Sequence, residues 1–202
     1  MSIIPVKLIQ NLNSNGVVVY PTSTLPGLGC LPNKLALDNL YRLKNRPAGQ
    51  PVSLGVADLK QATKLVNVPT IAVDILQNFP RGSLTLILDA VTKLDDRLGG
   101  DRVAVRVLAH ERAIELVKAV GPITATSANH SGVEPVFNTK LAAEILGLGN
   151  EGYVDGECPG GAPSTILSID KSEIKPDDYT VTIIREGVIP RTDVETWTMN
   201  YR

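Results

Sequence analysis

The segment at residues 17–30, with the sequence VVVYPTSTLPGLGC, constrains the fold more than any other part of the chain. Its β-branched start predicts a strand, which Pro21 ends because proline has no N–H to donate to a β-ladder. Gly27 and Gly29 permit a backbone conformation that a side chain would block, and the three hydroxyl residues at 22–24 can each donate and accept hydrogen bonds. Open α/β sheets place ligand sites at the carboxyl ends of strands, so we expect this turn to contact a small polar ligand.

Length and composition indicate one globular domain. The chain has 202 residues, of which 43% are hydrophobic and 20% charged, and a chain of this size can bury a continuous core. We expect this domain to span residues 1–189 and a polar tail containing Trp197 to span residues 190–202. The formal net charge of −1 excludes a molecule that is basic over its whole surface, so any basic patch must be local.

The sequence also predicts a cytoplasmic location. Cys30 and Cys158 are too few for a disulfide framework, and neither belongs to a CxxC pair. The first 16 residues lack the long apolar core of a signal peptide, and no apolar run approaches the length that spans a membrane.

The order of the predicted elements favours a mixed sheet. Apolar residues spaced by three and four predict helices, and β-rich runs between turns predict strands. The predicted helices span 6–12, 35–43, 58–66, 69–78, 111–120 and 139–146, and the predicted strands span 17–20, 51–56, 83–88, 103–107, 123–126, 153–155, 165–169 and 180–185. Helices and strands alternate early while the late strands cluster, so we expect an α/β fold with a twisted mixed β-sheet and helices packed on it.

Some motif matches carry little weight. Residues 147–152 fit GxGxxG but follow a predicted helix, whereas a dinucleotide-binding loop follows a strand, so we interpret them as a helix stop and a loop. The chain has no GxxxxGK[ST] motif. Residues 129–131 match a glycosylation sequon, but we do not expect this site to be glycosylated because nothing indicates secretion. His110 and His130 form no recognisable metal set with the cysteines, and Cys30 is most simply a small buried residue.

Cations and small hydroxyls gather at the predicted ends of strands and helices. Arg106 and Arg185 each lie at the exit of an apolar strand, Lys44 and Arg46 lie at and beyond a helix end, and the loop at 127–129 follows a third strand. Arginines in such a position can grip phosphate or carboxylate with two hydrogen bonds, so the pattern predicts a pocket for an anion. Taken singly, the helix-end cations could be solvated and the loop could be only an Asx-type turn.

Seven motifs occur in a fixed order over residues 16–187: PTSTLPGLGC, LKNRPAGQP, GSLTLIL, VAVRV, TSANHSG, GGAPSTI and IIREG. This ordered set resembles the YrdC-like family of threonylcarbamoyl-AMP synthases, in its single-domain form. The resemblance implies a YrdC-like fold with a concave basic ligand cavity. It also implies a nucleotidyltransferase that joins L-threonine, bicarbonate or carbon dioxide, and ATP with its Mg²⁺ into threonylcarbamoyl-AMP and pyrophosphate. The product would serve a separate transferase that makes threonylcarbamoyladenosine in tRNA, and weak direct binding of tRNA is a further expectation.

Matching positions in these motifs imply two subsites. Threonine would be held by Thr24, Arg106, Ser164 and the backbone at Ala125. ATP would be held by Lys44, Arg46, Gln50, Thr85, Ser127, Asn129 and Arg185. The motifs imply no general base. Lys44 and Arg46 would act by positioning, and the nucleotide would hold Mg²⁺ more than protein carboxylates would.

The chain departs from the family pattern at four places. Relatives commonly carry an acidic residue where Ser23 stands, an aromatic residue where Pro26 stands and a histidine near Gly55. An arginine turn, Arg81 with its neighbours, replaces a more usual Pro-Gly-Pro. Contacts that relatives make from these positions are therefore in question here.

Two alternatives belong to other functional classes. The first is an RNA-binding module that uses the same basic concave face, although 4% aromatic residues supply few stacking platforms for single-stranded RNA. The second is a carbamoyl-transfer domain with another acceptor, since YrdC-like folds also occur in hydrogenase-maturation carbamoyltransferases.

Overall fold

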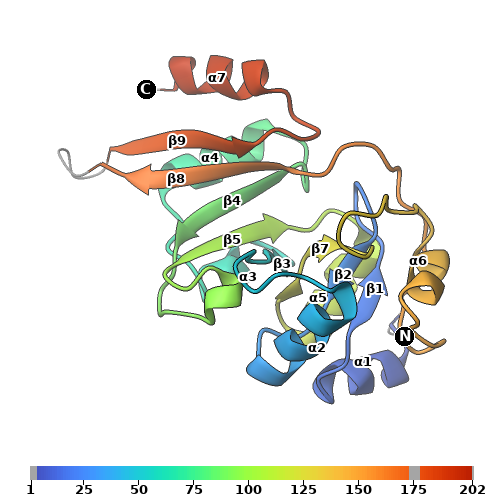
Figure 1. The fold of residues 1–202 in the computed structure, drawn as a ribbon. Helices are drawn as coiled ribbons and strands as arrows, with labels where there is room; N and C mark the ends of the chain where they lie inside the picture. The colour runs from blue at the N-terminus through green and yellow to red at the C-terminus, as the bar shows by residue number, and fades with distance from the viewer. Residues whose placement is uncertain (1–3, 173–177, 202) are drawn as a thin grey trace.

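The computed structural model describes residues 4–172 and 178–201, and a six-stranded mixed sheet forms its centre (Figure 1). The strand order is β6-β3-β5-β4-β8-β9, in which β3 pairs in parallel with β5 and β4 with β8, while the other pairs are antiparallel. The bounds are β3 Leu54–Val56, β4 Leu84–Asp89, β5 Arg102–Val107, β6 Ile123–Thr124, β8 Thr165–Lys171 and β9 Tyr179–Arg185. The prediction of a mixed sheet is confirmed.

A second, three-stranded antiparallel sheet lies beside the β3 end of the large one (Figure 1). Its strands are β1 Val18–Tyr20, β2 Gly27–Gly29 and β7 Thr126–Ser127. The prediction that the two glycines belong to a turn is wrong, because both lie in β2. Their small size makes room for an aromatic ring instead, since a Cβ on Gly27 would lie 2.6 Å from Cζ of Tyr20.

Helices pack around both sheets. They are α1 Val6–Asn13, α2 Lys34–Lys44, α3 Leu59–Ala62, α4 Thr70–Asn78, α5 Glu111–Val120, α6 Thr139–Ile145 and α7 Arg191–Asn200, with a 3-10 turn at Asp96–Leu98. Two helices begin at a side-chain N-cap, because Asn33 accepts a hydrogen bond from the Ala36 N–H and Asp58 accepts one from the Gln61 N–H. The helix predicted at 58–66 is shorter than expected and ends at Ala62.

The two faces of the large sheet differ in chemistry. Successive side chains of a strand point to opposite faces. On β5, Val103 and Val105 are buried in the main apolar cluster, which also includes Ile71 and Ile75 of α4. The alternate residues of the same strand, among them Arg106, line a cavity on the other face. One face of the sheet therefore builds the core and the other presents polar groups to a ligand.

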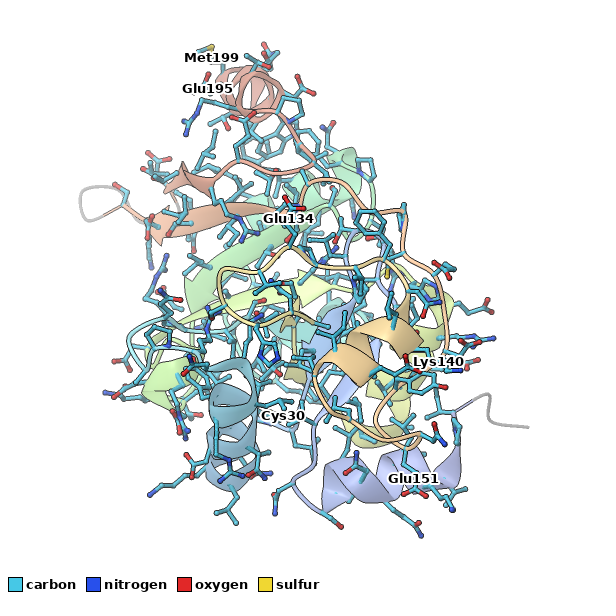
Figure 2. All side chains as sticks on the ribbon, turned by 45° about the vertical axis from the view of Figure 1, so that its right-hand side comes forward. Cys30, Glu134, Lys140, Glu151, Glu195 and Met199 are labelled. Carbon is cyan, nitrogen blue, oxygen red and sulfur yellow. The ribbon has the colours of Figure 1, made fainter. Side chains whose placement is uncertain are left out.

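The segment predicted as a tail contains helix α7, which packs beside β9 at the end of the sheet opposite β6 (Figure 1). The Trp197 and Tyr201 rings stack with centroids 4.7 Å apart, and the Tyr201 hydroxyl donates to Asp74 of α4 at 2.6 Å. Met199 points outward from this helix (Figure 2) and is 79% exposed. In the described part of α7, no residue lines the cavity.

The strand predicted at 153–155 is not formed. Tyr153 makes one isolated parallel bridge with Val19, in which the Val19 N–H donates to the Gly152 carbonyl and the Val154 N–H donates to the Val19 carbonyl, each at 2.8 Å. The segment crosses β1 at this point only, so no ladder develops. Within the described ranges, no helix has the length and apolar character needed to span a membrane.

Candidate functional site

A cavity of about 640 Å³ lies between the polar face of the large sheet and the turn that follows β1. This volume falls within the usual range for small-molecule sites. Eight of the residues predicted for the two subsites line it, and these are Thr24, Arg46, Thr85, Arg106, Ala125, Ser127, Ser164 and Arg185. Lys44, Gln50 and Asn129, which were predicted for the nucleotide, are not among the lining residues.

Arg106 is the deepest cation of the cavity. The residue is only 8% exposed, and its Nε donates to the Gly82 carbonyl at 2.8 Å. Its Nη2 donates to the hydroxyls of Thr24 at 3.0 Å and Ser23 at 3.3 Å. Burial lowers the pKa of Arg106, and the charge of Arg185 lowers it further. A buried cation without a carboxylate partner favours the binding of an anion.

The hydroxyls of the first turn hold one another in place. Thr22 donates from Oγ1 to the Leu25 carbonyl at 2.7 Å, and the same Oγ1 accepts from the Thr24 N–H at 3.1 Å. Thr24 Oγ1 then lies 3.3 Å from Thr22 Oγ1 while it accepts from Arg106. These hydrogen bonds orient the turn and place the Thr24 hydroxyl next to Arg106.

A second cation approaches the cavity from β9. Arg185 donates from Nη2 to the Ser164 carbonyl at 2.7 Å. The Ser164 and Thr85 hydroxyls are 2.8 Å apart, so a residue predicted for threonine and one predicted for ATP are hydrogen-bonded to each other. The two predicted subsites thus meet in one continuous cavity.

Arg46 is a further cation that lines the cavity. Its Nε donates to the Gln50 carbonyl at 2.7 Å and its Nη2 to the Pro51 carbonyl at 2.9 Å. Two backbone carbonyls therefore fix the guanidinium at the cavity wall. Gln50 contributes its carbonyl to this arrangement, and the residue itself is exposed.

Lys44 is buried behind the cavity wall. The residue is 3% exposed, and its Nζ donates to the carbonyls of Ser127 at 2.5 Å and Asn129 at 2.7 Å and to Asn129 Oδ1 at 3.0 Å. Burial, followed by the charge of Arg46, lowers the pKa of Lys44 to about 8. The lysine thus ties the end of α2 to β7 and the loop after it, which rules out the alternative of a solvated helix-end charge.

The backbone at Ala125 is also fixed by a neighbour. The Ala125 N–H donates to the Ser53 carbonyl at 2.7 Å, and the Ser53 hydroxyl donates to the Ala125 carbonyl at 2.7 Å. Ser53 itself lines the cavity. Because the carbonyl has a second lone pair, it can still accept a hydrogen bond from a ligand.

Sequence reasoning missed several lining residues. Among them are Tyr20, Ser53, Ile87, Ala104, Arg102, Ile166 and Ile184. The alternation of RVAVRV in β5 was an available signal, since it places Arg102, Ala104 and Arg106 on one face. Arg102 pairs with Asp89 at 2.6 Å and Asp170 at 2.5 Å, so its charge is compensated within the protein.

Protein side chains offer little to a metal ion here. No aspartate or glutamate of the described residues lines the cavity, and the same part of the chain holds no cluster of three or more histidine, cysteine or carboxylate groups. His110 is the residue before α5. Cys30 lies in the interior (Figure 2), and burial raises the pKa of its thiol to about 12. A thiol with this pKa is not a nucleophile at neutral pH.

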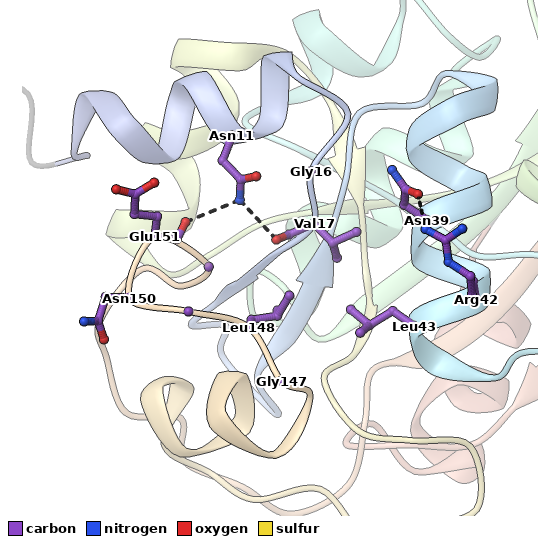
Figure 3. Close-up of a pocket in the computed structure, with 12 residues that line it drawn as sticks. Asn11, Gly16, Val17, Asn39, Arg42, Leu43, Gly147, Leu148, Asn150 and Glu151 are labelled. Carbon is purple, nitrogen blue, oxygen red and sulfur yellow. Dashed lines mark hydrogen bonds between the residues drawn. The ribbon is translucent and has the colours of Figure 1, made fainter.

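The GxGxxG match belongs to a separate, open groove of about 1010 Å³ (Figure 3). Gly147 has a φ of +69° and follows Leu146, the C-cap of α6, so the sequence interpretation of a helix stop and loop is confirmed. The Asn11 amide donates to the carbonyls of Val17 and Glu151, each at 3.4 Å, and so links α1 to this loop (Figure 3). Arg42 is the groove's arginine, and it donates to Asn39.

One family model and several relatives match most of the chain. The Sua5/YciO/YrdC family model, described as telomere recombination, matches residues 10–187. A threonylcarbamoyl-AMP synthase from Idiomarina loihiensis is 36% identical over 173 residues, which cover 81% of this chain and 92% of the relative. One from Bacillus subtilis is 35% identical over 191 residues, which cover 91% of this chain and 53% of the relative.

A solved structure with the same architecture contains an amino acid. Sua5 from Pyrococcus abyssi in complex with L-threonine has a TM-score of 0.79 and 28% sequence identity, and the match covers 93% of this chain and 55% of that one. The chain thus spans about half the length of the Bacillus and Pyrococcus proteins and most of the Idiomarina protein.

Proposed function

Because the chain belongs to the Sua5/YciO/YrdC family, we propose that it is a threonylcarbamoyl-AMP synthase that makes its product from L-threonine, bicarbonate or carbon dioxide, and ATP. Pyrophosphate is the second product. The relatives with this name match over most of the chain, and a structural neighbour holds L-threonine. The cavity supports the proposal because Arg46, Arg106 and Arg185 line it together with several hydroxyls.

Threonine binds at the deep end of the cavity. Arg106 faces its carboxylate, because this arginine is buried and, among the described residues, has no carboxylate partner and no hydrogen bond at Nη1. The Thr24 hydroxyl and the Ala125 carbonyl contact the amino acid's polar groups, since both residues line the cavity. Ser164 adds a hydroxyl on the side toward ATP.

ATP binds at the open end. Arg46 and Arg185 offset the phosphate charge, because arginine can bind phosphate oxygens in pairs. The hydroxyls of Thr85 and Ser127 contact the nucleotide from opposite walls. Lys44 and Asn129 act through Ser127, since both are hydrogen-bonded to it behind the wall.

The reaction depends on how the site positions threonine, carbon dioxide and ATP. The neutral amine of threonine captures carbon dioxide and loses a proton, and an oxygen of the carbamate attacks the α-phosphorus of ATP while the bond to pyrophosphate breaks. Such a transfer needs an in-line arrangement and charge stabilisation more than a general base. Mg²⁺ accompanies ATP and is held by its phosphates, in keeping with the lack of carboxylates among the described lining residues.

The observation that carries this proposal is the convergence of Arg46, Arg106 and Arg185 on one cavity with the hydroxyls of Thr24 and Ser164. The test is incubation of the purified protein with ATP, Mg²⁺, bicarbonate and each amino acid in turn, with pyrophosphate as the readout. Threonine should give the highest rate. Equal release with all amino acids, or release without any, would contradict the assignment.

The product implies a partner enzyme. A carbamoyl adenylate is a mixed anhydride that water hydrolyses, so a transferase that modifies tRNA must take it up promptly. Weak direct binding of tRNA by the cavity's rim belongs to the same proposal. Its affinity should fall steeply with salt, because phosphate contacts release counterions. Fluorescence anisotropy with labelled tRNA at two salt concentrations measures this, and no binding at low salt would contradict it.

A further inference from the structure

We propose that Arg81 is a positioning residue for the threonine subsite and acts on Arg106 through the carbonyl of Gly82. The inference rests on the proposed function, because it takes Arg106 as the partner of the threonine carboxylate. Arg81 lies in the turn between α4 and β4 and is not a lining residue of the cavity. Its effect on threonine must therefore be indirect.

The guanidinium of Arg81 joins two neighbouring strands. Its Nε donates to the Leu108 carbonyl at 2.8 Å, and its Nη2 donates to the Ala57 carbonyl at 2.5 Å. Leu108 follows β5 and Ala57 follows β3, and these two strands run in parallel. The planar guanidinium of Arg81 thus links the carboxyl ends of both strands. Arg106 lies at this same end of β5.

Gly82, the residue after Arg81, is closely packed against its neighbours. Gly82 has a φ of +80°, and a Cβ there would lie 2.6 Å from Ser23 Oγ and 2.9 Å from the Ala109 Cβ. The turn is closed by Ser83, whose N–H and hydroxyl both donate to the Pro80 carbonyl, at 3.0 and 2.6 Å. The Gly82 carbonyl therefore has one available position as long as the turn stays seated on the strand ends.

That carbonyl sets the orientation of Arg106. It accepts from Arg106 Nε at 2.8 Å, and a planar guanidinium with its Nε fixed directs Nη2 to Thr24 and leaves Nη1 for a ligand. If the turn loses its attachment through Arg81, the carbonyl can shift and the guanidinium can rotate with it. Small displacements of a binding group reduce productive binding strongly.

The test compares Arg81→Ala, Arg81→Lys and the wild type by steady-state kinetics and by calorimetric titration of L-threonine. Arg81→Ala should raise KM and Kd for threonine about tenfold while KM for ATP changes less than about twofold. Arg81→Lys should recover part of the loss, because an ammonium can donate to a carbonyl but lacks the planar fork. Arg191→Ala is the matched control, since Arg191 is exposed and pairs only with Glu195 among the described residues. It should match the wild type.

The outcomes separate this inference from the proposed function. A rise in both KM values by the same factor, or an unchanged threonine Kd in Arg81→Ala, would overturn the positioning role. A wild type that binds threonine but releases no pyrophosphate would contradict the proposed function, and a tenfold weaker Kd in Arg81→Ala would still support the positioning role. A wild type that binds no threonine would overturn both.

Discussion

Arg106 donates from Nη2 to Thr24 Oγ1 at 3.0 Å, and this bond joins two residues that are 82 positions apart in the chain. It connects the end of β5 with the turn after β1, the two segments that form the deep end of the cavity. The pair combines a buried cation with an oriented hydroxyl, a combination suited to the carboxylate and amine of an amino acid.

Replacement of Arg106 with alanine should raise the KM for threonine by about 30-fold or more, because losing one partner of a buried charged contact costs about 2 kcal/mol or more. The KM for ATP should change much less. Pyrophosphate release at varied threonine and varied ATP measures both values. Arg112→Ala, at a partly exposed arginine that pairs with Asp155, is the control. Equal increases in the two KM values would reject the assignment of Arg106 to threonine.

Serine should be a poor but measurable substrate. It differs from threonine by one methyl group, and one methyl in an apolar pocket is worth about 1–3 kcal/mol. The ratio of kcat/KM values for threonine over serine should therefore lie between roughly 10 and 200. Competition between the two amino acids with product masses as the readout determines this ratio. A ratio near one would contradict a pocket that contacts the methyl group.

Lys44 should make the stability of the protein depend on alkaline pH. Its pKa falls from 10.5 to about 8 on folding, so between these values the unfolded chain binds more protons and the free energy of unfolding rises with pH. From pH 8 to pH 10, the wild type should gain roughly 2 kcal/mol relative to Lys44→Met. Urea denaturation of both proteins at the two pH values measures the difference, which would stay constant if the lysine kept its ordinary pKa.

Gly27→Ala should destabilise the fold by about 1–3 kcal/mol, because the new methyl group would overlap the Tyr20 ring. That ring is fully buried, and its hydroxyl donates to the Thr124 carbonyl at 3.0 Å, so it has little room to move. Gly49→Ala is the matched control, since its Cβ would meet nothing within 4 Å. Denaturant unfolding should separate the two variants, and equal stabilities would show that Tyr20 can move aside.

Local signals in the sequence were sufficient for most elements. The caps at Asn33 and Asp58 depend on neighbours three residues away, and the helix predicted at 111–120 has the bounds of α5. The strand predicted at 103–107 likewise lies within β5, Arg102–Val107. These features depend on short-range hydrogen bonds and on periodicity, which a single sequence contains.

Long-range contacts explain what the sequence could not show. Lys44 is buried because its acceptors come from Ser127 and Asn129, 83 and 85 positions away, and no local pattern indicates them. Gly27 is suited to its place in β2 because the Tyr20 ring occupies the space that a Cβ at position 27 would fill. Eight of the residues predicted for the two subsites line the cavity, but the sequence did not distinguish residues that face the cavity from those that support its wall, such as Lys44.

Isotope-labelled bicarbonate provides the most direct test of the central claim, that one cavity joins threonine, a carbonate carbon and AMP. The protein is incubated with ATP, Mg²⁺, L-threonine and ¹³C-bicarbonate, the products are separated, and their masses are measured by mass spectrometry. We expect a labelled adduct with the mass of threonylcarbamoyl-AMP and one pyrophosphate for each adduct formed. ATP consumption that yields pyrophosphate or phosphate without the label in any threonine adduct would contradict the account.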